Sequence, residues 1–236
     1  MRFRSNSSIG KWLPLFTALL AIAAGLVITY LLFFTPDSVA ELSLENEEAD
    51  APVDADDLSG EWSTDAGSVA GYRVREELAT LSAPSDAVGR TSEVVGAVRI
   101  EDDGSSITAL RGSMIEVDLT SLESDESRRD DRIRTSGLES DSFPKATFEL
   151  TEDIELPNIL RDGSTVNVDA RGELALHGVT RSVTVPLEIR LSGATVQVVG
   201  RHDVSMSDYD IDVDLFGGFV SVEERGTIEF ELTLAR

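Results

Sequence analysis

The chain has 236 residues, of which 44 are acidic and 20 basic, giving a net charge of −24. Such a charge argues against binding nucleic acid, whose phosphates need a basic surface, and against lying flat on anionic lipid, which attracts basic segments. The sequence contains no cysteine, which excludes disulfides, a thiol nucleophile, cysteine metal ligands and a lipid anchor on cysteine.

The first predicted element is a membrane-spanning helix over residues 13–34, a run of 22 residues without a charged side chain. A hydrocarbon core about 30 Å thick needs about 20 apolar residues in a helix. Residues 1–12 carry Arg2, Arg4 and Lys11 and are expected to stay in the cytoplasm, because basic residues flank the cytoplasmic side of a span. We therefore expect a single-pass protein of the cell membrane with an extracytoplasmic C-terminal domain.

A cleaved signal peptide is the alternative interpretation of the same segment. Residues 38–40 (SVA) have the small-x-small form of a cleavage site. The run is longer than the apolar region of about 7–15 residues that is usual in signal peptides, which favours a retained anchor. Cleavage near Ala40 would give a secreted protein, so both interpretations export the domain.

Residues 35–57 are predicted to form an acidic, disordered linker. Nine acidic side chains and no basic one lie between residues 37 and 57, and Pro36 and Pro52 interrupt regular structure. Low hydrophobicity and repulsion between like charges keep such a segment extended. The folded domain is therefore expected over residues 58–236.

Within that domain, apolar and polar residues alternate with a period of two, which predicts β-strands with one wet and one dry face. Ile228, Phe230 and Leu232, for example, alternate with Glu229 and Glu231. Short turn segments separate most of the runs, which favours antiparallel neighbours. The eight predicted strands are 68–76, 92–102, 106–119, 146–154, 164–176, 182–192, 195–206 and 226–235.

One helix is expected between the third and fourth strands, over residues 124–136. Residues 120–123 (TSLE) have the form of a capping box, and Gly137 fits a C-terminal cap. Nearly all of its side chains are polar, so we expect the helix on the surface or across one end of the sheet.

Eight antiparallel strands with one apolar face either close into a barrel or split into a sandwich. A closed barrel of eight strands has room for its own side chains or for one small ligand. The inward residues are mostly Val, Leu, Ile and Ala, whose small volumes favour an apolar cavity. Sandwich cores use the same residue types, so periodicity leaves both architectures open.

The order of six local motifs resembles the YceI-like family of polyisoprenoid-binding proteins. The resemblance covers residues from about 60 to 236. The motifs are 68–76 (SVAGYRVRE), 88–91 (VGRT), 117–122 (VDLTSL) with 129–132 (RDDR), 143–148 (FPKATF), 172–183 (GELALHGVTRSV) and 207–211 (SDYDI).

This resemblance implies an all-β fold, an eight-stranded antiparallel lipocalin-like barrel with one short helix, here preceded by the N-terminal transmembrane helix. It also implies an elongated apolar cavity for an isoprenoid or fatty chain, without catalysis and without a cofactor. The predicted tether distinguishes this chain from soluble periplasmic members. It favours local sequestration of a ligand over carriage between membranes.

Apolar and aromatic side chains are the candidates for lining the cavity, with simple core filling as the alternative for each. They are Tyr72, Phe143, Phe148, Leu174, Leu176, Tyr209, Phe216 and Phe219.

Arg129, Arg132 and His177 are the candidates for contacting a ligand head group. The guanidinium fork suits a phosphate, although acids on the same helix are equally near and pairing with them is the preferred interpretation. For His177 the preferred interpretation is a hydrogen bond to the backbone of its turn.

No catalytic or metal-binding residues are assigned. The sequence has two histidines, His177 and His202, and no Gly-x-Ser-x-Gly nucleophile elbow. Aspartates alternate over 208–214, but on a strand such neighbours lie about 6.8 Å apart, and the Gly and Glu of a calcium loop are missing. We interpret them as a solvated acidic face.

The sequence therefore predicts a membrane-tethered, extracytoplasmic protein that holds an isoprenoid or other long-chain amphiphile in a barrel cavity, without catalysis. The alternative is a structural or protein-interaction module of the cell envelope with a packed barrel and an unspecified protein partner. An enzyme of isoprenoid or envelope metabolism is the third hypothesis and would need a polar cluster with a shifted pKa inside the cavity. A cavity in the centre of the barrel would favour the first hypothesis, and a centre filled by side chains would favour the second.

Overall fold

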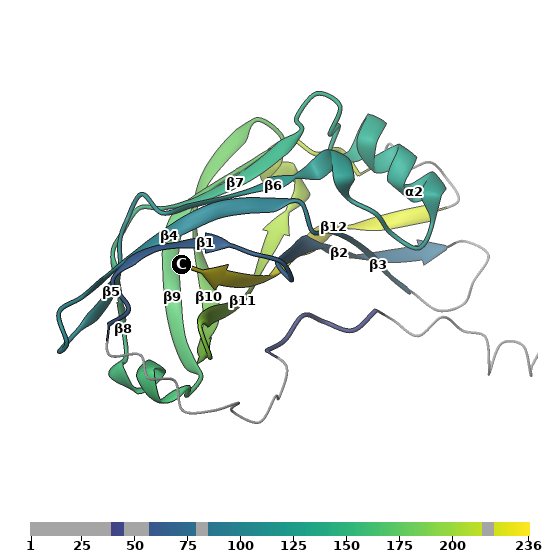
Figure 1. The fold of residues 1–236 in the computed structure, drawn as a ribbon. Helices are drawn as coiled ribbons and strands as arrows, with labels where there is room; N and C mark the ends of the chain where they lie inside the picture. Colours follow the sequence, from purple (N-terminus) through teal and green to yellow (C-terminus); the bar gives the residue numbers. More distant parts are fainter. Residues whose placement is uncertain (1–38, 45–56, 79–84, 214–219) are drawn as a thin grey trace, which may run out of the picture. The chain divides into compact units, whose positions relative to one another are not determined.

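The structure is a computed structural model that describes residues 39–44, 57–78, 85–213 and 220–236 (Figure 1). The predicted membrane helix at 13–34 and its flanking residues 1–12 lie outside the described residues. Within the described ranges, no helix has both the length and the apolar character needed to cross a membrane.

Within the described residues, twelve antiparallel strands form one sheet. The strands are β1 (Gly60–Thr64), β2 (Val69–Leu78), β3 (Ser85–Thr91), β4 (Val94–Asp102), β5 (Ile107–Ala109), β6 (Met114–Asp118), β7 (Lys145–Leu150), β8 (Ile154–Leu156), β9 (Val166–Leu176), β10 (Val179–Ser192), β11 (Thr195–Ser205) and β12 (Val220–Ala235).

The sheet closes on itself through β1. Strand β12 pairs with β2 over most of its length and with β1 at its end, where Ser63 is opposite Ala235. Strand β1 also pairs with β4, where Trp62 is opposite Val98. Because β12, β11, β10, β9, β7, β6 and β4 are joined in that order, the β1 pairings complete a barrel. Closure rules out the sandwich that periodicity alone had left open.

The twelve strands occupy eight positions around the barrel. Strands β1 and β2 follow one another beside β12, β3 and β4 run alongside them, and β5 and β6 both pair with β4. Strands β8 and β7 in turn pair with β5 and β6. The predicted all-β barrel of eight antiparallel strand positions is thus confirmed. The sequence pattern missed β1 and β3 as separate strands, because neither shows a long alternation of its own.

The helix is shorter than predicted. The α-helix α2 spans Ser127–Arg132 and continues as one π-helical turn, η3 (Ile133–Gly137). Its N-cap is Glu126, whose side chain accepts from the Arg128 amide. The predicted capping box is wrong: Asp118 caps the 3₁₀ turn η2 (Leu119–Ser121), and Glu123 pairs through its backbone with Arg90 of β3.

The C-terminal cap also differs from the prediction. Gly137 closes the π-helical turn, and the left-handed residue that follows is Glu139, with a φ of 45°. The helix was predicted on the surface or across one end of the sheet, and α2 indeed lies at one end of the barrel, away from β5 and β8 (Figure 1).

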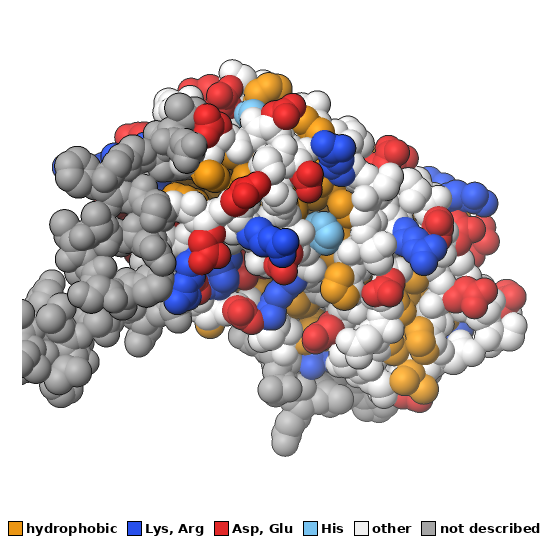
Figure 2. Space-filling model, turned by 180° about the vertical axis from the view of Figure 1, so that it is seen from behind, with side chains coloured by type: hydrophobic (Ala, Val, Ile, Leu, Met, Phe, Trp, Pro, Cys, Tyr) orange, Lys and Arg blue, Asp and Glu red, His pale blue; other side chains and the backbone are white. Residues whose placement is uncertain are grey.

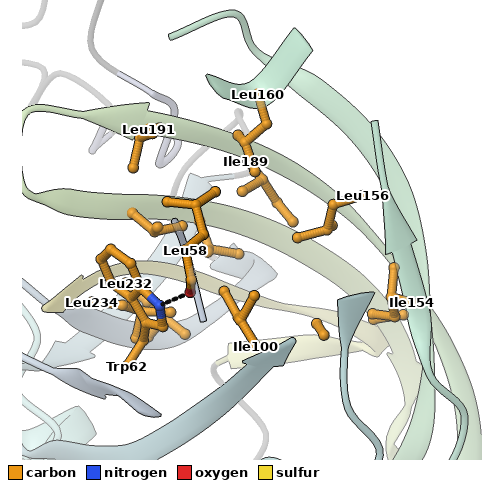
Figure 3. Close-up of a cluster of buried hydrophobic side chains, with 14 of the residues drawn as sticks. Leu58, Trp62, Ile100, Ile154, Leu156, Leu160, Ile189, Leu191, Leu232 and Leu234 are labelled. Atoms are coloured by element: carbon orange, nitrogen blue, oxygen red, sulfur yellow. Dashed lines mark hydrogen bonds between the residues drawn. The ribbon is translucent and has the colours of Figure 1, made fainter. Parts of the chain in front are cut away.

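The end of the barrel near β5 and β8 is filled by its own side chains (Figure 3). Leu58, Trp62, Ile107 and Leu160 are each at most 1 % exposed there. The Trp62 Nε1 donates a hydrogen bond of 2.9 Å to the Leu58 carbonyl, so its one polar atom is satisfied. Leu160 comes from the 3₁₀ turn η4 (Asn158–Asp162), which closes this end. We call this region the packed end.

Residues 39–44 lie against the outside of the barrel. Arg73 and Arg90 donate hydrogen bonds of 3.2 and 2.5 Å to the Ala40 carbonyl, and Arg201 contacts both Glu41 and the Leu42 carbonyl. The Leu42 side chain is buried. These six residues belong to the segment that the sequence analysis assigns to the linker, and here they pack on the domain.

A buried carboxylate underlies this contact. Glu229 of β12 is 0 % exposed on the outer face of the strand. Arg73 and Arg90 pair with it at 3.3 and 2.7 Å. A buried charge needs such partners, because desolvation without them is costly. On the face of the molecule seen in Figure 2, basic side chains are likewise interleaved with acidic ones.

Candidate ligand cavity

The barrel encloses two neighbouring cavities along its bore. One, of about 160 Å³, lies in the middle and extends toward the packed end. The other, of about 110 Å³, lies below α2 and is called here the α2-end cavity. Ala70, Val117, Ala146 and Ile228 line both, so the two cavities are neighbours on either side of these residues. The centre of the barrel is therefore not solid.

Small residues on the inner wall create this space. Ala70, Ala109, Ala146 and Ala170 are buried and line the bore at positions where larger aliphatic residues would fill it. Interiors normally pack without voids much larger than a water molecule, so cavities of this size are unusual for a solid core.

Glycines let aromatic rings lie flat against the same wall. A Cβ added to Gly200 would lie 2.3 Å from the Phe230 ring, and one added to Gly172 would lie 2.5 Å from the Phe148 ring. Phe230 and Gly200 face each other across β12 and β11. Both rings line the middle cavity, and the missing side chains of the glycines leave room for them.

One ion pair borders the α2-end cavity. Arg129 of α2 donates from Nε to Glu76 Oε1 at 3.2 Å and from Nη2 to Oε2 at 3.1 Å. Its remaining nitrogen, Nη1, donates to Ser124 Oγ at 3.2 Å and to Asp125 at 2.5 Å. Glu76 points inward from β2 and is 8 % exposed. All three guanidinium nitrogens are thus occupied, with two carboxylates around one cation.

The Tyr72 side chain lies beside this pair. It lines the α2-end cavity, and its ring covers Gly89 of β3, where an added Cβ would lie 2.3 Å from the ring. Its hydroxyl is buried and has no hydrogen-bond partner among the described residues. Burial raises the pKa of Tyr72, so the hydroxyl keeps its proton at neutral pH.

The predicted lining residues fall into three groups. Tyr72 and Leu176 line the α2-end cavity, and Phe148 and Leu174 line the middle one. Tyr209 is buried in the hydrophobic cluster at the same end as α2 and lines neither cavity.

Phe143 packs against the His177 ring, with centroids 4.5 Å apart, and also lines neither cavity. Phe216 and Phe219 lie outside the described residues.

The three predicted head-group residues are not brought together. Arg129 lines the α2-end cavity, whereas Arg132 and His177 do not. The His177 Nδ1 lies 2.9 Å from the Tyr209 carbonyl, and its Nε2 lies 4.0 Å from Glu139. The His177 ring therefore forms a hydrogen bond with a backbone carbonyl, as predicted. The carbonyl belongs to a different turn from the predicted one, namely η5 (Met206–Tyr209).

Asp208, Asp210 and Asp212 are exposed, and Asp214 lies outside the described residues. In the part of the chain that the structure describes, no three His, Asp or Glu side chains come close enough to hold a metal ion.

The sequence analysis missed Glu76, although a signal was present. Ala70, Tyr72, Val74 and Glu76 are spaced two residues apart along β2, so their side chains lie on the same, inner face of the strand. An acid on an apolar face predicts a buried partner. No comparable signal marks Glu229, which lies on the polar face of β12 and is buried only by residues distant in the sequence.

A closed barrel of eight strand positions with an apolar bore defines the class of lipocalin-like barrels, which enclose side chains or one small ligand. Within this class the chain belongs to the YceI-like domain family, which it matches over residues 62–234. The family resemblance noted in the sequence is thereby confirmed.

Two solved structures share the fold. A polyisoprenoid binding domain from Saccharophagus degradans, implicated in plant cell wall breakdown, superimposes with a TM-score of 0.57 at 17% identity, covering 74% of this chain and 97% of the other. BcnA from Burkholderia cenocepacia gives a TM-score of 0.54 at 18% identity, covering 72% and 98%. At these identities the likeness concerns the fold alone.

Relatives detected by sequence include two UPF0312 proteins. The protein from Vibrio parahaemolyticus is 30% identical over 114 residues, 45% of this chain and 57% of its own length. That from Vibrio vulnificus strain YJ016 is 27% identical over 128 residues, 51% of this chain and 64% of its own. The matched part of the chain thus spans about three fifths of these relatives.

Proposed function

We propose that this protein binds an isoprenoid or another apolar-chain amphiphile in the bore of its barrel, without chemical change to the ligand. The observation that carries the proposal is the pair of neighbouring, mainly apolar cavities within a closed barrel. The polyisoprenoid-binding relative from Saccharophagus degradans, which has the same fold, supports this ligand class. A packed interaction module would have no use for the empty volume.

The size of the cavities agrees with a useful affinity. A cavity of about 150 Å³ holds the six carbons of benzene, so the two cavities together take roughly ten carbons. Burying ten carbons gains about 8 kcal/mol before ordering costs, at about 0.8 kcal/mol per CH₂. That gross value corresponds to a dissociation constant of about 1 μM. A ligand chain of more than roughly ten carbons would extend beyond these two cavities.

We further propose that residues 13–34 hold the barrel at the extracytoplasmic face of the cell membrane. Their length, the absence of charge and the preceding basic residues support this. The mass of the purified mature protein tests the anchor. A mass that includes residues 13–34 is expected, and a chain starting at Glu41 would contradict it.

Photolabelling of the full chain in lipid nanodiscs tests the binding site. A ten-carbon hydrocarbon carrying a diazirine is expected to label peptides of β7, β9 and β11, and unlabelled myrcene should compete. Peptide mapping separates this signal from labelling of residues 13–34. Label confined to that segment would overturn the proposal.

A matched pair of variants sharpens the test. Ala146→Leu adds three carbons where the two cavities meet and should reduce labelling of the barrel several-fold. Val95→Leu enlarges a side chain that is 58% exposed outside the barrel and should leave labelling unchanged. Circular dichroism confirms that both variants are folded. Equal labelling of the two would count against a ligand in the bore.

A further inference from the structure

The two ends of the bore are closed by different kinds of contact. At the packed end, Trp62 and its neighbours are almost fully buried, so opening that end would bring large apolar side chains into water. The α2-end cavity is covered by residues 124–138, which contain α2 and η3 and are called here the lid. Gly137 is the one buried residue of the lid, although Ile133 and Leu138 line the cavity. Opening the lid therefore exposes less apolar surface than opening the packed end.

The lid lies between two residues that the barrel holds in place. Before it, Glu123 exchanges two backbone hydrogen bonds with Arg90 of β3, at 2.9 and 3.0 Å. After it, Ser140 is buried. The backbone is extended at Glu126, where α2 begins, and left-handed at Glu139, which follows the π-helical turn. Residues at the ends of an element are the usual hinges, so the lid can move as one piece between these two points.

An ion pair fastens the lid to the inner face of the barrel. Arg129 of the lid donates to both carboxylate oxygens of Glu76 on β2, at 3.2 and 3.1 Å. The two side chains are 17 % and 11 % exposed, so the pair lies close to water at the border of the cavity. When the lid lifts, both charges can be hydrated, which offsets much of the lost attraction. Separated apolar side chains gain nothing comparable, so this contact can open and close more readily than the packed end.

Resting on the proposed function, we propose that residues 124–138 form a hinged lid, that the Arg129–Glu76 pair is its latch, and that the ligand enters and leaves the bore beneath it. The packed end stays closed during this exchange. The stability of the latch then sets how fast a ligand is exchanged.

The rate at which the ten-carbon photoprobe leaves the full chain in nanodiscs tests the latch. Bound probe is displaced by excess myrcene, and light given after set delays reports the probe that remains in the barrel. In Arg129→Met the probe should leave about ten- to a hundredfold faster than in wild type, the effect of losing one charged hydrogen-bonded contact. Arg134→Met is the matched control, because Arg134 pairs with Asp131 inside the lid, and it should leave the rate unchanged.

A reversible crosslink tests the lid in the opposite sense. The chain has no cysteine, so Glu76→Cys with Arg129→Cys provides two thiols that a bis-methanethiosulfonate can bridge after the probe has been loaded. The bridge should retain the probe several-fold longer, and a reductant should restore the rate of the unbridged protein. Glu152→Cys with Arg171→Cys is the control, because these two side chains pair in an exposed position on the outside. Bridging them should not change the rate.

A thiol inside the bore provides a measurement that needs no ligand. Ala146→Cys places a thiol where the two cavities meet, and its reaction with a water-soluble methanethiosulfonate requires access to the bore. Adding Arg129→Met should accelerate this reaction about ten- to a hundredfold, whereas adding Arg134→Met should not. Circular dichroism confirms that each variant is folded.

Two results would overturn the lid. One is a bridged lid that releases the probe as fast as the unbridged protein, and the other is a bore thiol that reacts equally fast with and without Arg129. If the probe never labels the barrel of the wild type, the proposed function fails instead, and the reactivity of the bore thiol still decides whether the lid opens.

Discussion

The two ends of this barrel are built from the same kind of alternating strand and yet differ in their interiors. At the packed end, a tryptophan and several leucines and isoleucines fill the bore and are almost fully buried (Figure 3). At the α2 end, alanines and glycines leave a cavity bordered by an ion pair and by Tyr72, whose hydroxyl has no hydrogen-bond partner in the described part of the chain. The packed end therefore supplies much of the buried core, whereas the space for the proposed ligand lies in the middle of the bore and at the α2 end.

Each end also has an ion pair whose carboxylate is largely buried, and the two pairs have different surroundings. At the packed end, Asp102 pairs with Arg161 and also accepts from the Leu58 and Gly104 amides. At the α2 end, Glu76 has Arg129 as its hydrogen-bond partner. The first pair joins β4 to the turn η4, whereas the second joins β2 to the short helix α2. Variants that remove equivalent groups at the two ends test the contrast.

The largest effect is expected for Trp62→Ala at the packed end. Loss of a fully buried tryptophan should lower the free energy of unfolding by about 3–5 kcal/mol, measured by urea denaturation. Leu176→Ala, next to the existing α2-end cavity, should cost about 2 kcal/mol, the lower end for such deletions. Equal losses at the two sites would contradict the assignment of stability to the packed end.

The second effect is expected for Asp102→Asn. The hydrogen bond from Arg161 lowers the pKa of Asp102, so its ionised form stabilises the folded state above the unfolded pKa of about 3.9. At pH 7 the variant should lose about 1.5–3 kcal/mol of unfolding free energy.

The pH dependence provides the check on that variant. The stability that a lowered carboxyl pKa provides is lost as the pH falls from the pKa of the unfolded state toward the pKa of the folded state. The difference between wild type and Asp102→Asn should therefore shrink below about pH 4. A difference that stays constant down to pH 2 would show that the charge of Asp102 is not responsible.

The third effect concerns the wall between the two ends. Gly200→Ala places a Cβ where the Phe230 ring now lies, which should cost about 1–3 kcal/mol and push the ring into the bore. Labelling of the barrel by the ten-carbon photoprobe should fall with it. Phe230→Leu in the same chain should restore much of the stability, and a failure to do so would mean that the ring is not the obstructing group.

The smallest effect is expected for the double variant Glu76→Leu and Arg129→Met. Replacing both partners of a buried pair by apolar side chains of similar volume is often nearly neutral, so the free energy of unfolding should stay within about 1 kcal/mol of wild type. The matched double variant Asp102→Leu and Arg161→Met should be clearly less stable, because two backbone amides lose their acceptor. Similar values for the two would remove the contrast between the ends.

The sequence by itself determined the strand-rich domain and most of its strand positions. Alternation such as that of Ile228, Phe230 and Leu232 fixes which side chains face inward, because the period of a strand is two residues. It did not determine β1 or the closure through Trp62 and Val98, since pairing between strands far apart in the sequence leaves no local pattern. The alternation of β2 contains the signal that Glu76 faces inward, but it carries no information on Arg129 as its partner.

Only the tertiary structure decided which inward residues fill the bore and which leave it open. Tyr72 and Tyr209 are indistinguishable as sequence letters, yet the first borders a cavity because its ring lies over Gly89, and the second is enclosed by the hydrophobic cluster. Likewise, Glu229 is buried because Arg73, Arg90 and residues 39–42 meet over it. Volume and burial depend on what several distant segments bring to one place, and a single segment does not encode them.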